Sequence, residues 1–288
     1  MQYHRYKSEN SITCLLCKHY CTLKEDKGGI CGVNINEGGV LKNLVYNHPS
    51  ALHLDPIEKK PLYHFLPGSK SLSLGTVGCN FRCPFCQNYS ISQTEVVDTS
   101  ITYTPQDIVE LALKHEAQSI SYTYNEPTIW YPYARDIGFL AKERGLKNVF
   151  VSNGFESSEV LEDMKLWVDA ANIDLKSFSK EYYKKTLKGE LDGVLETLKT
   201  LAQSDIHLEI TTLLIPDIND SVEEVTQMAG FIATELGCDI PWHLSAFHPD
   251  YKMLETHPTE LAKMQRAQEI AQGFGIKNVY LGNTMSAI

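Results

Sequence analysis

The sequence predicts an α/β fold in which a partial barrel of six strand–helix units follows a small cysteine-rich region. From residue 69 onward, apolar strand-like runs alternate with helical segments, an order that implies a parallel sheet with right-handed crossovers. The 288 residues suffice for one barrel and a small appendage, but the six or seven units that can be counted are too few for a complete eight-fold barrel. Four cysteines stand together near the start of the chain. We therefore expect two regions, residues 1–68 and residues 69–288.

The N-terminal region is defined by four cysteines with the spacing C-x2-C-x3-C-x9-C: Cys14, Cys17, Cys21 and Cys31. Four soft ligands in so short a stretch predict a closed metal site, which would hold zinc or an auxiliary iron–sulfur cluster. A disulfide pair is the alternative, and a reducing compartment argues against it.

Residues 33–70 show little periodicity. Residues 34–46 resemble a hairpin around Glu37-Gly38-Gly39. Residues 55–68, with the sequence DPIEKKPLYHFLPG, contain three prolines and charges of both signs, so we expect an ordered connector rather than a helix. Its aromatic residues favour packing beside the cysteine loop described below.

The barrel region follows with a regular order of elements. Thr104 is a good N-cap residue with proline after it, Gly145 ends a helix, and Ser157 with Ser158 begins another. The expected strands are residues 72–77, 119–124, 148–151, 170–175, 206–214, 242–246 and 278–282. The expected helices are residues 105–115, 131–144, 158–168, 193–203, 221–236 and 259–274.

Three cysteines follow the first barrel strand. Cys79, Cys83 and Cys86 form a C-x3-C-x2-C pattern, and thiolates at this spacing suit an iron–sulfur cluster or zinc. No fourth cysteine stands nearby in the sequence. Three ligands for four irons would leave one iron open to a small molecule, whereas a three-cysteine zinc knuckle is the alternative.

Polar residues follow the later strands, and in parallel α/β folds the chemistry lies at the carboxyl ends of the strands. Each has an ordinary alternative: a turn, a helix start, a surface ion pair or a structural histidine. The candidates are Asn125 and Glu126, Ser152 and Asn153, Asp174 and Lys176, Ile215, and His243.

With Phe85 before its last cysteine, the cysteine motif resembles that of the radical S-adenosylmethionine (radical SAM) superfamily. The resemblance implies a six-unit partial barrel, and it implies that Cys79, Cys83 and Cys86 hold a [4Fe-4S] cluster whose open iron binds SAM. In that superfamily SAM is cleaved to a 5′-deoxyadenosyl radical that abstracts a hydrogen atom. A Gly-Gly-Glu-like element holds the SAM amino group there; Glu126 matches it, whereas Asn125 departs from it.

The resemblance extends over nearly the whole chain. The order DLK, IPDIND and a strand-borne histidine is similar to the glycyl-radical-activating branch, such as pyruvate formate-lyase activating enzyme. The closer resemblance is to the AmmeMemoRadiSam family, through the N-terminal cysteines, DPIEKKPLYHF-x-PGS, GCNFRCPFCQN, YNEPT, SNG, HLSAFHPDYKM and VYLGN. It implies SAM contacts for Phe85, Asn125, Glu126, Ser152, Asn153, Asp174, Lys176, Ile215 and His243, but it supplies no substrate.

The amino-acid composition argues against some classes of binding partner. The net charge of −10 argues against broad nucleic-acid binding, and no apolar run is long enough to span a membrane. The polar first ten residues lack a signal-peptide core, so we expect a cytoplasmic enzyme. The expected reaction needs an electron donor such as flavodoxin or ferredoxin, and its substrate is a small molecule or a protein. The alternatives are an activase for a glycyl-radical enzyme and a non-enzymatic zinc-binding module.

Overall fold

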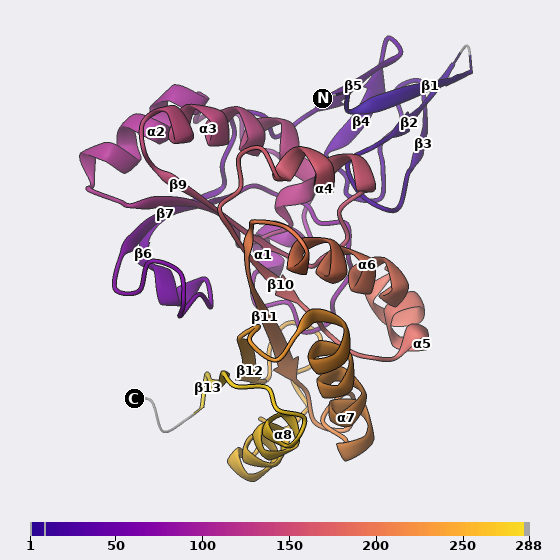
Figure 1. Cartoon of the computed structure of the whole chain (residues 1–288). Coiled ribbons are helices and arrows are strands. Elements are labelled where there is room, and N and C mark those ends of the chain that lie inside the picture. Colours follow the sequence, from indigo (N-terminus) through magenta and orange to yellow (C-terminus); the bar gives the residue numbers. More distant parts are fainter. Residues whose placement is uncertain (1, 9, 285–288) are drawn as a thin grey trace.

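The computed structural model describes residues 2–8 and 10–284, and its centre is an eight-stranded sheet (Figure 1). The strand order is β13-β12-β11-β10-β9-β8-β7-β6; strands β7 to β13 are all parallel, whereas β6 pairs antiparallel with β7. The order confirms the predicted parallel sheet. The bounds are β6 Ala51–Pro56, β7 Lys70–Gly75, β8 Ser119–Tyr122, β9 Lys147–Ser152, β10 Ala170–Asp174, β11 His207–Leu214, β12 Trp242–Ala246 and β13 Val279–Gly282.

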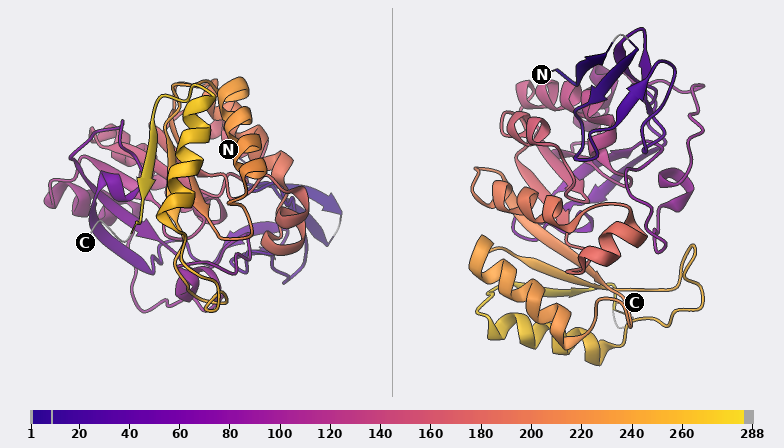
Figure 2. Two further views of the ribbon diagram at one scale, coloured as in Figure 1. Left: turned by 90° about the horizontal axis from the view of Figure 1, so that it is seen from below. Right: turned by 90° about the vertical axis from the view of Figure 1, so that its right-hand side faces the viewer.

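A longer helix follows each strand from β7 to β12, which gives the six predicted strand–helix units. These helices lie on the outside of the curved sheet, as the views in Figures 1 and 2 show. In the described part of the chain, no helix has the length and apolar character needed to span a membrane. The helices are α2 Pro105–Lys114, α3 Tyr131–Glu143, α4 Ser158–Met164, α6 Leu191–Ala202, α7 Val222–Phe231 and α8 Leu261–Gly273.

Side-chain caps explain why several helix starts were predictable. The Thr104 hydroxyl accepts the Asp107 N–H while Asp107 accepts the Thr104 N–H, a reciprocal capping box at α2. Ser157 caps α4, and Ser221 caps α7. The remaining short helices are η1 Ile57–Lys59, α1 Tyr89–Ser92, η2 Pro127–Trp130, α5 Lys180–Tyr182, η3 Tyr183–Leu187 and η4 Ile232–Leu236.

Several elements differ from the sequence-based expectation. The helix predicted to reach residue 168 ends at Met164, and the helix predicted over residues 221–236 is α-helical only to Phe231. Strand β6 and the three strands of the N-terminal region were not predicted. Along β6 only Asp55 is buried, so the strand lacks the alternation of buried and exposed residues that marks a half-buried strand. Its pairing with the edge of β7, a long-range contact, is what makes it a strand.

The N-terminal region forms a three-stranded sheet, with β1 His4–Ser8, β2 Ser11–Cys14 and β3 Thr22–Lys24, and the expected hairpin of β4 Asn34–Glu37 and β5 Val40–Asn43. It packs beside α4 (Figure 1). The Lys18 N–H donates to the Phe155 carbonyl at 3.0 Å, and the Ser157 N–H donates to the Leu16 carbonyl at 3.2 Å. A domain boundary near residue 68 stays a prediction, and β6, before that point, belongs to the large sheet.

The connector, residues 55–68, crosses the inner face of the sheet near the amino ends of its strands. Asn172, in the middle of β10, donates to the Pro61 carbonyl at 2.8 Å. Buried apolar side chains of the connector pack on β9 and β10: Ile57 and Leu62 contact Val149 and Ala170. The connector therefore packs on the inner face of the sheet at these strands.

A buried carboxylate anchors the connector. Glu209, on β11, accepts the backbone N–H groups of Tyr63 at 3.1 Å and His64 at 2.8 Å. It also contacts the rings of His207 at 3.0 Å and His243 at 2.6 Å. Burial alone would raise the pKa of Glu209, but these four donors outweigh burial and lower the pKa to about 2.

Glu209→Gln is expected to lower the free energy of unfolding at pH 7 by about 3 kcal/mol, since a pKa lowered from 4.5 to about 2 corresponds to that amount. The folded-state pKa is below the unfolded value, so the contribution is present above the unfolded value and is lost as the pH falls from there toward 2. Urea unfolding at pH 7 and about pH 3.5 should therefore give a smaller mutant–wild-type difference at the lower pH. The exposed Glu223→Gln is the control; an equal difference at both pH values would contradict the assignment.

Candidate active site

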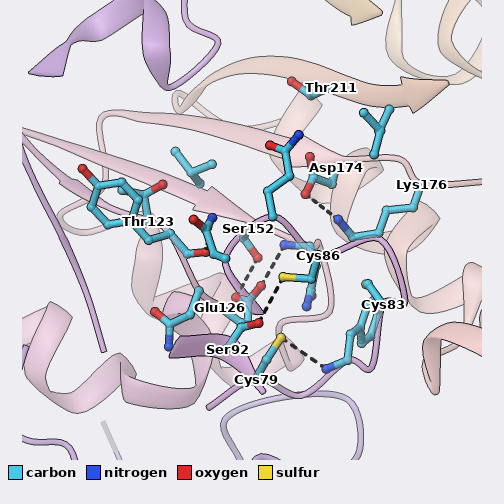
Figure 3. A pocket seen from close by; sticks show the side chains of 18 of the residues that line it. Cys79, Cys83, Cys86, Ser92, Thr123, Glu126, Ser152, Asp174, Lys176 and Thr211 are labelled. Atoms are coloured by element: carbon cyan, nitrogen blue, oxygen red, sulfur yellow. Dashed lines mark hydrogen bonds and ion pairs between the residues drawn. The ribbon is translucent and has the colours of Figure 1, made fainter. Parts of the chain in front are cut away.

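A cavity of about 330 Å³ lies where the loops after β7, β8, β9 and β10 meet (Figure 3). Most residues predicted from the strand ends line it together. Because parallel strands bring their carboxyl ends to one edge, residues far apart in sequence gather here. The predicted residues that line the cavity are Cys79, Cys83, Phe85, Cys86, Asn125, Glu126, Ser152, Asn153, Asp174 and Lys176.

The cysteine loop, residues 76–88, brings three free thiols to this cavity. Burial raises the pKa of Cys83 to about 12 and raises that of Cys79 well above its ordinary value, with Glu126 adding to the effect on Cys79. The Cys86 sulfur lies 3.0 Å from the Ser92 hydroxyl, and the Cys79 sulfur accepts the Phe81 N–H at 3.4 Å. Buried thiols of this kind become thiolates only when a positive charge, such as that of a metal, compensates them.

The donor set of the loop fits an iron–sulfur cluster by its chemistry. Three sulfur atoms line one cavity, and polar groups for a small ligand surround them. Within residues 2–8 and 10–284, no three His, Cys, Asp or Glu side chains stand in a metal-coordinating arrangement. The fit therefore rests on the identity of the donors and on their common cavity.

Asn125 ties the loop after β8 to the cysteine loop. Its Oδ1 accepts the Thr76 N–H at 3.0 Å and the Trp130 indole N–H at 3.1 Å. Its Nδ2 donates to the Thr76 hydroxyl at 3.1 Å and the Gly78 carbonyl at 2.9 Å. Protein groups thus use the full hydrogen-bonding capacity of this buried amide. Its side chain fixes the relative position of the two loops.

Glu126 points into a buried polar network (Figure 3). Its carboxylate accepts hydrogen bonds from the Ser152 hydroxyl at 2.9 Å, the Asn153 N–H at 2.8 Å and the Thr128 hydroxyl at 2.6 Å. Burial, and then the nearby Glu156, raise the pKa of Glu126 above its ordinary value. A cationic group in the cavity would oppose this shift and hold Glu126 ionised.

Glu156 was not predicted from the sequence. It is fully buried, it shares the Ser152 hydroxyl with Glu126, and its Oε2 has no hydrogen-bond partner among the described residues. Glu156 precedes the N-cap residue Ser157 and forms an isolated bridge with Cys17, and an acidic residue at such a place gives no sequence signal for burial. Two carboxyl groups joined through one hydroxyl favour a shared proton.

Asp174 and Lys176 form an ion pair on the cavity wall, with 2.6 Å between the Lys176 ammonium and the Asp174 carboxylate (Figure 3). Burial lowers the pKa of Lys176, but Asp174 and Cys83 outweigh burial and raise it. The ammonium also lies 5.9 Å from the centre of the Phe85 ring. A lasting positive charge therefore faces the cysteine loop.

Two predicted residues lie outside the cavity lining. Ile215 is fully buried, and its N–H donates to the Asn219 side chain at 2.6 Å. His243 is buried against Glu209 and packs edge-on against the Tyr63 ring, with 4.7 Å between ring centres. Both lie in the protein interior, and the SAM contacts predicted for them stay predictions.

The cavity has further lining residues that sequence reasoning missed. Lys59 and Lys60 come from the connector, and Thr211 and Ser245 come from β11 and β12. The connector showed no periodicity from which its orientation could be predicted. The positions of Thr211 and Ser245 could have been predicted from strand alternation, because residues two apart on a strand point to the same face. Thr211 therefore shares the inner face with Glu209, and Ser245 shares it with His243.

The N-terminal cysteine set, namely Cys14, Cys17, Cys21 and Cys31, lies together in the N-terminal region. Burial raises the pKa of Cys17 well above its ordinary value, and the neighbouring Cys14 and Cys31 add to it. Burial also raises the pKa of Cys14 to about 12. The four thiols are free. The thiols are near enough to influence one another electrostatically, but among the described residues no three of them stand in a metal-coordinating arrangement, so the bound metal remains a prediction.

This region touches the cysteine loop directly. Arg82 of the loop donates to the carbonyls of Ile30 and Cys79, and the His19 ring lies 3.0 Å from the Asn80 carbonyl. Gly78 has φ +87°, and a Cβ there would lie 2.6 Å from the Cys31 carbonyl. Only glycine allows so close an approach. The N-terminal region therefore braces the cysteine loop.

Comparison with known proteins places this geometry in a family. Residues 73–229 match the Radical SAM superfamily. A Methanocaldococcus jannaschii protein described as uncharacterized is 41% identical over 278 residues, which cover 96% of this chain and 82% of that protein. Pyruvate formate-lyase 1-activating enzyme of Escherichia coli K12 is 20% identical over 226 residues, which cover 70% of this chain and 89% of the enzyme.

A solved structure supports the same fold. The radical SAM methyltransferase of Sphaerobacter thermophilus aligns with a TM-score of 0.59 at 12% identity, over 77% of this chain and 69% of that chain. The predicted partial barrel and superfamily resemblance are confirmed.

Asn125→Ala is expected to destabilise the fold by about 2–4 kcal/mol, because it leaves buried donors such as the Trp130 indole N–H unpaired. Trp130→Phe removes only one of these hydrogen bonds and should cost less. Urea unfolding measures both. A loss below about 1 kcal/mol for Asn125→Ala would show that the amide does not hold the two loops together.

Proposed function

This chain belongs to the radical SAM superfamily, and we propose that it is an enzyme that cleaves SAM reductively and abstracts a hydrogen atom from a substrate. The observation that carries the proposal is the cavity that Cys79, Cys83 and Cys86 share with Glu126 and Lys176. A [4Fe-4S] cluster on these cysteines would supply the electron that converts SAM to a 5′-deoxyadenosyl radical. The chain's own residues bind, orient and shield these groups.

The polar residues at the strand ends are proposed to hold SAM. Glu126 carries a buried carboxylate that suits the SAM ammonium group, and Ser152 and Asn153 keep it in place. Lys176 supplies the cation for the SAM carboxylate. Asp174 orients that cation through its ion pair. Glu126 and Lys176 would thus each face a group of opposite charge in SAM, and Asp174 pairs with Lys176 in the protein.

A second candidate function is activation of a glycyl-radical enzyme, with a protein as the substrate. The named function of the Escherichia coli relative favours it, since that relative is an activating enzyme. The third expectation, a non-enzymatic zinc module, is disfavoured by membership of an enzyme superfamily. An electron donor such as flavodoxin or ferredoxin and a cytoplasmic location complete the proposal.

For the N-terminal cysteine set we propose a bound metal, zinc or a second cluster. The spacing of the four cysteines supports it, together with the electrostatic influence of Cys14, Cys21 and Cys31 on Cys17. Four soft donors would close the coordination shell and leave no open position, which suits a structural site.

Cys83→Ala is expected to abolish SAM cleavage, because the cluster loses one of three ligands. The measurement is 5′-deoxyadenosine formation with dithionite, after anaerobic reconstitution. Cys238→Ala is the matched control, since Cys238 lies in neither cysteine set. Retained cleavage by Cys83→Ala, with its cluster present, would falsify the cluster assignment.

Cys17→Ala is expected to lower the metal content without removing the cluster of the cysteine loop. Iron, sulfide and zinc are counted in the same anaerobic sample. Wild type should hold about four irons and one zinc, or about eight irons if the N-terminal set binds a second cluster. A variant with unchanged iron and zinc would rule out metal at the N-terminal set.

A further inference from the structure

The connector brings two lysines into the cavity from outside the strand-end motifs. Lys59 and Lys60 line the same cavity as the cysteine loop. The connector crosses the sheet near the amino ends of the strands, whereas the cysteines follow a carboxyl end. These connector lysines therefore approach the cavity from a separate layer of the structure. The SAM contacts proposed above make no use of them.

Lys60 is a buried lysine that pairs with Asp55. Its side chain is 3% exposed, and its Nζ lies 2.8 Å from Asp55 Oδ2 and 4.6 Å from the centre of the Tyr124 ring. Among the described residues, Asp55 is its one hydrogen-bond acceptor. An ammonium has three N–H donors, so two remain for an acceptor in the cavity. A buried cation with free donors favours an anionic ligand.

Asp55 does not neutralise both lysines. Its Oδ1 lies 3.5 Å from Lys59, and its Oδ2 accepts a hydrogen bond from the Tyr124 hydroxyl at 2.6 Å as well as from Lys60. Burial would raise the pKa of Asp55, but Lys60 and Tyr124 outweigh it and hold the pKa below its usual range. One carboxylate thus faces two ammonium groups, which leaves an excess positive charge.

Among the described residues, no carboxylate other than Asp55 forms an ion pair with Lys59 or Lys60. Asp174 and Lys176 pair with each other, and Glu126 is committed to the network around Ser152. The chain as a whole carries a net charge of −10, so the two connector lysines with their single carboxylate contrast with the molecule around them.

We propose that Lys59 and Lys60 bind an acidic group, a carboxylate or a phosphate, on a small-molecule substrate. The inference rests on the proposed function, which places SAM at the cysteine loop and leaves the connector lysines to the substrate. SAM itself carries a net positive charge, so an anionic substrate complements it. The connector lysines line the same cavity of about 330 Å³ as the residues proposed to hold SAM.

The test is equilibrium dialysis of labelled inorganic phosphate and, separately, labelled succinate against the reconstituted, SAM-bound protein. The two probes distinguish a phosphate from a carboxylate. The double variant Lys59→Met/Lys60→Met should bind the preferred probe at least about tenfold more weakly, because charge-assisted hydrogen bonds are lost. Lys180→Met is the control, since Lys180 is as exposed as Lys59 and lies outside the cavity lining.

A second variant guards against misfolding. Lys60→Met leaves the Asp55 carboxylate without its closest cation, which could prevent folding. The double variant Asp55→Asn/Lys60→Met removes both charges. This double variant should fold and should still bind the probe more weakly than wild type. Unchanged probe binding in folded variants, or no binding of either probe to the SAM-bound wild type, would overturn the inference.

Failure of the proposed function gives a different result. The same preparations are assayed for 5′-deoxyadenosine. SAM cleavage by wild type without anion binding contradicts the substrate class alone. Absence of SAM cleavage in the reconstituted wild type contradicts the proposed function, and the inference falls with it.

Discussion

The hydrogen bonds of Asn125 set the geometry on which the candidate site depends. Cys79 and Glu126 belong to loops that follow different strands, and the sheet alone fixes only where these loops begin. A buried amide with four protein partners fixes how they continue. An unmade hydrogen bond in such an environment is costly, so the two loops are strongly held in one arrangement.

The N-terminal region adds a second restraint on the same loop. Arg82 reaches the Ile30 carbonyl, and Gly78 lies against the Cys31 carbonyl. Both contacts involve the backbone beside the last cysteine of the N-terminal set. Anything that orders this backbone, a bound metal included, also orders the cysteine loop. The two cysteine sets are therefore coupled through packing, whatever their separate chemistry.

Sequence reasoning succeeded where periodicity and strand ends carry the signal. The parallel strands, the caps at Thr104 and Ser157 and the gathering of Cys79, Glu126 and Lys176 all follow from local pattern and the geometry of parallel sheets. Sequence reasoning failed where contacts between residues far apart in the sequence determine the structure. Strand β6 gains its structure from β7, and the connector gains its place from Glu209.

The difference between local pattern and long-range contact also explains why the roles of some residues were hard to predict. His243 stands on a barrel strand, as the pattern indicated, but its ring faces a carboxylate that serves the connector. Lys60 had no pattern at all, yet it lines the cavity. The connector folds back across the sheet. A residue that is far from the active-site loops in the sequence can therefore still line the cavity. The connector therefore belongs to the architecture of the cavity as much as the strand ends do, because its anchor at Glu209 holds the segment that brings Lys59 and Lys60 to the cavity wall.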